Sequence, residues 1–295
     1  MDILPQLLIN ALITGSIYAL ASAGLALCYG VLRILNFAHG HLMMTGVYLF
    51  YLFSVTLGLA LLPAALSTAL AVAAVGAVSF TVFVRPFTRH NPVLPLVTTL
   101  ALSTVLESSV AMAFGVNVKS LNTEMVSSLE IYGIFITPLQ IGIIISALLL
   151  LGLTGLVIHF TPAGRTLRAL AENEEAAQSL GIGSDRIRFL VFLISALMAA
   201  YAGIMLGYET NLQPTMGNSY TIKAFAAMVL GGLGNIWGTV AGAYLLGLVE
   251  NLSIGLDFGG YSLPAGYRDA FAFMAILLML LVRPSGLFRR AARRL

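Results

Sequence analysis

Charged side chains make up only 9% of this 295-residue sequence, whereas 59% of its residues are hydrophobic. A soluble domain carries about 25% charged residues, so this composition cannot cover a water-facing surface. The single cysteine, Cys28, lies inside an apolar run, which excludes a disulfide framework and suits a packing residue. The net charge of +3 comes from a few arginine clusters rather than a basic stripe, so we expect no nucleic-acid partner.

Motifs that would carry chemistry are also missing. The sequence has no GxxxxGK[ST] phosphate loop, so the chain cannot bind ATP in the P-loop manner. It has no HExxH or CxxC spacing and no evident pairing of a nucleophile with a base, so we expect no metal site, no cofactor and no catalytic residue. The opening MDILPQLLINAL lacks a basic region and a small-residue cleavage site, which favours the start of a membrane segment over a removable signal.

Long apolar runs fill the sequence instead. They approach the roughly 20 residues that cross about 30 Å of hydrocarbon as a helix. The runs are continuous rather than alternating, which argues against a β-barrel. We therefore predict an all-α polytopic membrane protein, with residues 1–295 forming a single transmembrane domain. Its eight hydrophobic stretches span residues 5–32, 36–57, 59–84, 93–115, 138–160, 187–208, 220–251 and 267–283.

The seventh stretch is too long for a simple crossing. At 1.5 Å per residue, 220–251 would make a helix about 48 Å long, and glycines weaken its middle at the sequence GGLGNIWG. We therefore expect two shorter helices that meet at Gly231, Gly232 and Gly234. This split raises the expected number of crossings to about nine.

Arginine clusters support the split. They follow the third stretch, lie between the fifth and sixth, and form a basic tail at 284–295, and the positive-inside rule places all three groups in the cytoplasm. Three single crossings between Arg188 and Arg283 would leave the tail outside, whereas four return it to the cytoplasm. The expected topology has the N-terminus outside and the C-terminus inside.

Polar residues interrupt the start of the second stretch. Residues 33–40 read RILNFAHG, with Asn36 and His39 where an ordinary membrane helix is apolar, and Gly40 follows directly as a further pathway candidate. Non-helical backbone at membrane depth is tolerated beside a water-filled path, and two glycine-interrupted segments, one in each half, indicate a central substrate pathway. The alternative is an ordinary helix end with polar capping at the interface. His39 and His41 are two apart on this helix and would point in different directions.

Ionisable residues inside apolar stretches are further pathway candidates, because charges in a membrane are costly. Glu107, midway along the fourth stretch, either faces the passage or holds helices together with help from neighbouring serines. Lys223 and Glu250 are expected near the outer ends of the split stretch, where each can reach water or a partner. Lys223 could meet a substrate carboxylate there, or only snorkel to the interface.

Residues 161–186 form the longest hydrophilic segment that we place in the cytoplasm. Thr161 followed by Pro162 suits a helix start, Asn173 suits the cap of a second short helix, and Gly181 can end it. We predict a compact elbow of two amphipathic helices that can dock into a groove of a partner. The alternative is a solvated loop that only joins two spans.

This elbow carries a recognisable pattern. Glu175-Ala176-Ala177 followed by Gly181 resembles the EAA–x3–G core by which ABC importer permeases engage their ATPases. The chain more specifically resembles branched-chain amino acid permeases of the LivH type. Four blocks in family order carry this resemblance: GSIYALASAGLALCYGVLRILNFAHG, RTLRALAENEEAAQSLGI, KAFAAMVLGGLGNIWGTVAGAYLLGLVE and RPSGLF, at residues 15–40, 165–182, 223–250 and 283–288. The Leu-Pro pair of other importer permeases is missing after the elbow, as is usual in this branch.

The resemblance implies an ABC importer permease fold in a bacterial-type inner membrane. It implies a homologous permease of the LivM type, two ABC ATPase subunits that bind the ATP, and a periplasmic substrate-binding protein as partners. Branched-chain amino acids would be the substrate, with selectivity set mainly by the binding protein. The ATPase-coupling residues that it indicates are Arg165, Arg168, Glu172, Asn173, Glu175, Ala176, Ala177, Gly181 and Ile182.

Three other interpretations stay open on the sequence alone. The same scaffold serves importers of urea, short amides or other amino acids, and nothing in the sequence separates these substrates. A channel or ion-coupled carrier would work without ATP and would favour buried acids such as Glu107. A purely structural membrane subunit is the third interpretation.

Overall fold

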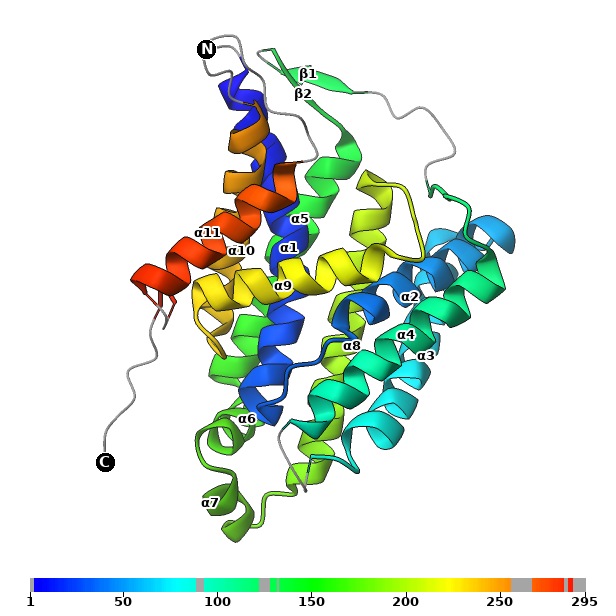
Figure 1. Ribbon diagram of the computed structural model, residues 1–295. Helices are drawn as coiled ribbons and strands as arrows, with labels where there is room; N and C mark the ends of the chain where they lie inside the picture. Colours follow the sequence, from blue (N-terminus) through cyan, green and yellow to red (C-terminus); the bar gives the residue numbers. More distant parts are fainter. Residues whose placement is uncertain are drawn as a thin grey trace.

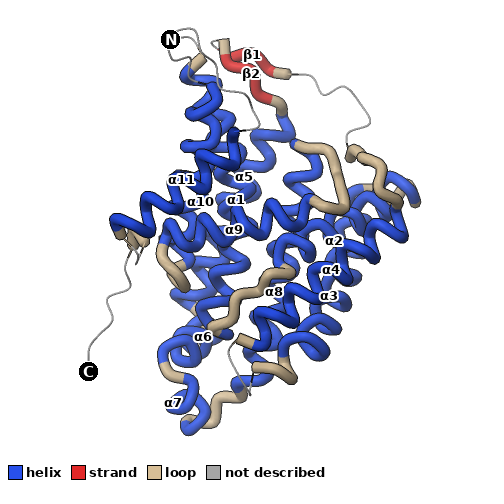
Figure 2. The backbone as a smooth tube through the Cα atoms, in the orientation of Figure 1, coloured by secondary structure: helices blue, strands red, loops and turns tan. Residues whose placement is uncertain are grey.

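The computed structural model describes residues 3–88, 93–121, 128–131, 133–255, 267–283 and 286–288. Most of these residues are helical, and the helices pack around one long central helix (Figures 1 and 2). The basic tail predicted at 284–295 lies outside the described residues except for 286–288. Arg89, which belongs to the arginine cluster after the third stretch, also lies outside them.

The elements follow one another along the chain as a helical bundle with one small hairpin. The first half contains α1 (Leu4–Leu32), α2 (His39–Tyr51), the π-helical turn η1 (Leu52–Thr56), α3 (Leu61–Ser79), the π-helical turn η2 (Phe80–Val84) and α4 (Leu94–Phe114). The second half contains the antiparallel strands β1 (Leu129–Ile131) and β2 (Ile134–Ile136), then α5 (Pro138–Phe160), α6 (Pro162–Glu172), α7 (Glu174–Ser179), α8 (Ser184–Glu209), α9 (Met216–Gly231), α10 (Ile236–Gly255) and α11 (Arg268–Val282).

Helix α1 lies at the centre because its sequence is apolar and small-residue-rich on every side. It is buried along most of its length and packs against α5, α8, α9 and α10. Helices α3, α4 and α5 lie on the outside of the bundle, and their leucines and valines are largely exposed. Apolar surface of this extent needs lipid or another protein to cover it. The chain is therefore a multi-pass membrane protein, as the composition predicts.

Five helices among the described residues are long and apolar enough to cross a membrane, namely α1, α3 with η2, α4, α5 and α8. The bent pair of α9 and α10 makes a sixth if it counts as one span. The expected eight or nine crossings are therefore not confirmed. The shortfall arises where α2 begins only at His39, after six residues without helix, and where the described part of α11 is short.

The predicted break in the seventh stretch is confirmed. Helix α9 ends at Gly231, α10 begins at Ile236, and the two meet at an angle of 116°. Gly232 and Gly234 adopt φ values of 111° and 78°, a region that residues with a side chain rarely adopt. A Cβ atom on Gly231 would overlap the backbone of Gly238, so the two helices touch directly below the turn.

Residues 286–288 bind to the end of α9, next to the turn between α9 and α10. The Leu287 amide donates to the Leu230 carbonyl at 2.9 Å, and the Phe288 amide donates to the Gly231 carbonyl at 3.2 Å. The last carbonyls of a helix lack partners within the helix, so these bonds satisfy groups that α9 leaves open. The start of the C-terminal tail therefore lies against the tip where α9 turns into α10.

Candidate functional site

The predicted interruption at the start of the second stretch is confirmed. Helix α1 stops at Arg33, whose φ of 53° and ψ of 29° are left-handed, and helix resumes only at His39. Side chains satisfy the backbone between them: the Phe37 amide donates to Thr99 Oγ1 at 3.2 Å, and the buried Asn36 side chain accepts from the amide two residues on. This buried non-helical segment is stabilised by specific polar partners, as such backbone must be at membrane depth.

Three consecutive residues of α2 face three different helices. His39 Nε2 lies 2.8 Å from the Ala21 carbonyl on α1, and the Gly40 amide donates to Thr221 Oγ1 on α9 at 3.0 Å. His41 turns toward α4, so the expected divergence of the two histidines is confirmed. The two interrupted segments of the sequence, α1–α2 and α9–α10, thus lie side by side through α2 and α9 (Figure 1).

Glu107 is held by two partners from outside its own helix. Its Oε2 atom lies 3.2 Å from His41 Nε2, and Asn218 of α9 donates to the same oxygen at 3.1 Å. The expected help from serines is wrong for Ser103 and Ser109, whose hydroxyls donate to carbonyls of α4 itself. Sequence reasoning missed His41 and Asn218 as partners, although both are polar residues in otherwise apolar helices. The Glu107 side chain stays 29% exposed, so it is both a helix-packing group and a surface group.

From these contacts we expect the hydrogen bonds of Glu107 to contribute more to stability and uptake than its charge does. In the Glu107→Gln variant the side-chain oxygen can still accept a hydrogen bond, so the uptake rate should stay within about fivefold of wild type. The Glu107→Leu variant leaves His41 and Asn218 without this acceptor, so the free energy of unfolding should fall by about 1–3 kcal/mol. Thermal unfolding of the purified complex and the uptake rate measure the two effects. Equal damage from both substitutions would show that the negative charge itself is required.

Lys223 and Glu250 form a buried ion pair. Lys223 Nζ lies 3.3 Å from Glu250 Oε1 and donates to the Tyr18 hydroxyl at 2.9 Å, and that hydroxyl donates to Glu250 Oε2 at 2.8 Å. The ammonium also lies over the rings of Tyr18 and Tyr220, at 5.3 and 5.8 Å from their centroids. Glu250 is fully buried and Lys223 is 12% exposed. Each residue was expected to reach water or a partner, and in the structure they are partners of each other because the bend between α9 and α10 brings them together.

The predicted two-helix elbow at 161–186 is confirmed in its local geometry. Thr161 Oγ1 accepts from the Gly164 amide and Asn173 Oδ1 accepts from the Ala176 amide, each at 3.1 Å, so both predicted caps are present. Leu170 and Ala177 are buried on the inner side. The outer side presents the exposed candidates Arg165, Glu172, Asn173, Glu175, Ala176 and Gly181.

Arg33 links this elbow to the break between α1 and α2. Its Nη2 atom donates to the Ala171 carbonyl at 3.0 Å and approaches the Glu172 carbonyl at 3.4 Å, at the C-terminal end of α6. A cation there also interacts favourably with the helix dipole. Sequence reasoning missed this contact because an arginine after an apolar run looks like an ordinary interfacial flank. A further contact, between Glu174 and Arg188, holds α7 to the start of α8.

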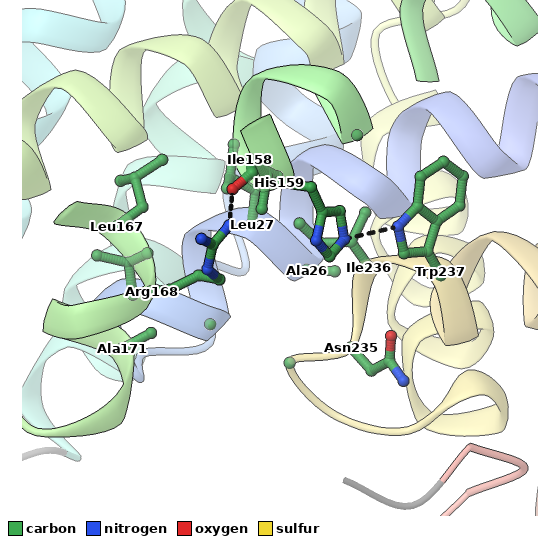
Figure 3. Close-up of a pocket in the computed structure, with 14 residues that line it drawn as sticks. Ala26, Leu27, Ile158, His159, Leu167, Arg168, Ala171, Asn235, Ile236 and Trp237 are labelled. Carbon is green, nitrogen blue, oxygen red and sulfur yellow. Dashed lines mark hydrogen bonds between the residues drawn. The ribbon is translucent and has the colours of Figure 1, made fainter. Parts of the chain in front are cut away.

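Arg168 lines a pocket beside the elbow. Figure 3 shows its guanidinium pointing to the Ile158 carbonyl at the end of α5, with His159 facing Trp237 across the pocket. Trp237 Nε1 donates to His159 Nε2 at 3.4 Å. The cavity has a volume of about 220 Å³ and is bordered by α1, α5, α6 and the turn at Gly234. Arg168, one of the predicted ATPase-coupling residues, caps the end of α5, and the elbow directly adjoins the α9–α10 break.

A substitution at Gly181 should impair the elbow through its backbone alone. Gly181 has a φ of 82°, and a Cβ atom there would meet nothing within 4 Å. Gly181→Val should therefore strain the turn by about 1–2 kcal/mol without any steric clash, uncoupling ATP hydrolysis from uptake while membrane insertion stays intact. The matched control is Gly181→Asn, since asparagine tolerates this conformation. The ratio of ATP hydrolysed to substrate taken up is the measurement, and a normal ratio in Gly181→Val would contradict the role.

Residues 7–282 match the family described as the permease component of branched-chain amino acid transport systems. The chain belongs to this permease family. The permease is 34% identical to the high-affinity branched-chain amino acid transport system permease protein BraD of Pseudomonas aeruginosa, over 97% of this chain and 95% of the relative. It is equally identical to LivH of Escherichia coli strain K12, with the same coverage.

A solved structure shows the same fold. The permease resembles a metal-chelate-type ABC transporter in an inward-facing conformation, with a TM-score of 0.50 and 19% identity over 94% of this chain and 84% of the other. At this identity the likeness concerns the fold alone. The permease thus has an ABC transporter permease fold, and its relatives are transport subunits rather than enzymes.

Proposed function

We propose that this chain is the membrane-spanning permease subunit of an ATP-driven ABC importer for branched-chain amino acids. It forms the translocation pathway with a second, homologous permease of the LivM type in a bacterial-type inner membrane. A periplasmic binding protein delivers the substrate, and two ABC ATPase subunits bind the ATP. The observation that carries the proposal is the meeting of two interrupted membrane segments, where the Gly40 amide bonds to Thr221.

Residues 161–186 are the cytoplasmic loop through which the ATPases act. The exposed residues of the elbow, including Glu172, Glu175 and Ala176, are available to a partner, whereas its buried side and Arg33 attach it to the bundle. Closure of the ATPases would displace the elbow as a rigid body and move α5 and α8 with it. Because α6 also contacts the break in α1–α2 through Arg33, the same displacement reaches the pathway, giving access first from one side and then from the other.

The arrangement of the chain ends supports this orientation. The pocket beside the elbow is bordered by the α9–α10 turn, and residues 286–288 lie against the same turn. The elbow and the start of the arginine-rich tail therefore share one end of the bundle, while the β1–β2 hairpin lies at the other end (Figure 1). If the elbow and the tail at 284–295 both lie in the cytoplasm, the arginines of both segments agree with the positive-inside rule.

Uptake by the reconstituted complex tests the proposal. Proteoliposomes that contain the permease pair, the ATPases and the binding protein should accumulate radiolabelled leucine only when ATP is supplied. Radiolabelled urea and other amino acids in parallel assays define the substrate class. Transport by this chain alone without ATP would show a channel or secondary carrier, and ATP-driven uptake of urea but not leucine would show the related amide importer.

A further inference from the structure

A polar pocket of about 380 Å³ lies at the N-terminal end of α9. Helix α8 begins beside the elbow and ends at Glu209, so the loop 210–215 that forms one wall lies at the end of α8 farthest from the elbow. Most of the lining is hydroxyl and amide side chains, including Asn211, Gln213 and Ser219. Such a pocket suits a small polar ligand that enters from the side opposite the ATPases.

Among the residues that the structure describes, Lys223 is the cation that lines this pocket, and its position is fixed by the bundle. Lys223 belongs to the lining, together with Tyr220, whose ring lies under the ammonium. The carboxylate of Glu250 and the hydroxyl of Tyr18 hold the same ammonium from the buried side. Glu250 is fully buried, so Lys223 borders the pocket and Glu250 does not. A preoriented ammonium at a polar pocket is a recognition group for a carboxylate.

We propose that this pocket, in the importer described above, binds the α-carboxylate of the transported amino acid at Lys223. Asn211 and Gln213 belong to the same lining, and their side chains carry oxygens that can accept from the α-ammonium group of a zwitterion. Buried Glu250 holds the Lys223 ammonium in place and offsets the cost of an ammonium in a membrane interior. Urea and neutral amides have no carboxylate for Lys223, so the pocket selects zwitterionic amino acids.

Labelling of a cysteine placed in the pocket tests ligand binding directly. The Thr215→Cys variant puts a thiol in the pocket lining, and the only native cysteine, Cys28, is fully buried. In the assembled complex without binding protein, leucine should slow maleimide labelling of this variant at least about fivefold, the lower end of ordinary coupling between ligands. Leucinamide, which keeps the side chain and the ammonium but lacks the carboxylate, should not. Adding Lys223→Gln together with Glu250→Gln, which removes both charges of the buried pair, should abolish the protection.

A charge-balanced double variant separates binding from a purely structural ion pair. Lys223→Gln alone leaves Glu250 buried without its cation, so it is expected to lose both assembly and uptake. Lys223→Gln with Glu250→Gln removes both charges and should regain assembly, measured by co-purification of the subunits, but not leucine uptake. Wild-type uptake by the double variant would overturn the proposal, and so would absent protection or equal protection by leucinamide.

If the double variant does not assemble, the comparison of leucine with leucinamide in the labelling of Thr215→Cys still tests whether the pocket binds the carboxylate. Failure of the wild-type complex to take up leucine with ATP would instead refute the proposed function. These failures are distinguishable, because the labelling needs neither ATP nor the binding protein.

Discussion

Gly40→Ala is expected to abolish uptake by preventing α2 and α9 from meeting. A Cβ atom on Gly40 would overlap the Gly217 carbonyl and the Thr221 hydroxyl, and would lie 2.6 Å from the Thr221 nitrogen. Two of these atoms belong to backbone, so no flexible side chain can move away. Overpacking costs about 1–3 kcal/mol in ordinary cores, and separation of the helices here would also break the bond from the Gly40 amide to Thr221.

Gly142→Ala is the matched control for this substitution. Gly142 lies in helix α5, and a Cβ atom there meets nothing within 4 Å. Both variants should be compared by the yield of the assembled complex, its thermal unfolding and its leucine uptake. Gly142→Ala should behave as wild type in all three. A Gly40→Ala complex with wild-type stability and uptake would show that the close approach of α2 to α9 is not needed.

Removal of the Arg33 guanidinium should reduce uptake per ATP hydrolysed by about fivefold or more, the lower end of ordinary coupling between sites. The Arg33 side chain connects α6 of the elbow to the non-helical segment that precedes His39. Arg33 is exposed, so the bond adds little to stability, and lost coupling would not reflect unfolding. Arg33→Gly is the informative substitution, because glycine adopts the left-handed conformation of this residue while removing the side chain.

Two further variants complete this experiment. Arg33→Lys keeps the charge and should retain part of the coupling. Arg33→Ala removes the bond and also strains the backbone, so it should unfold at a lower temperature than Arg33→Gly. ATPase activity and leucine uptake are measured in the same proteoliposomes. Wild-type coupling in Arg33→Gly would mean that the elbow acts on the pathway through α5 and α8 alone.

Much of the architecture follows from local signals in the sequence. Gly232 and Gly234 mark the α9–α10 turn because their backbone leaves the helical region, and Thr161 and Asn173 mark the elbow because they cap its helices. These features depend on residues within a few positions of one another. A single sequence therefore suffices to predict them.

The partners of the polar residues depend on tertiary packing and could not be predicted in the same way. Lys223 meets Glu250 only because the chain reverses at the break, and Glu107 meets His41 and Asn218 from two other helices. Hydropathy shows that such residues are costly in a membrane, but not which neighbour offsets the cost. The number of crossings is not confirmed for a related reason, since an apolar stretch can be interrupted, as 220–251 is, and hydropathy does not show whether its two helices cross separately.

The sidedness of the elbow gives the most direct test of the account. Ala176 is exposed on the elbow, and Cys28 is fully buried, so the Ala176→Cys variant gives this chain one reactive thiol, which can be labelled in intact cells or sealed vesicles. A reagent with one thiol-reactive end and one photoreactive end should cross-link this position to the ATPase subunit, and the yield should change when ATP is added. A membrane-impermeant maleimide added from outside should leave the variant unlabelled. Rapid labelling from outside, with no cross-link to the ATPase, would contradict the claim that ATP hydrolysis moves this permease through its elbow.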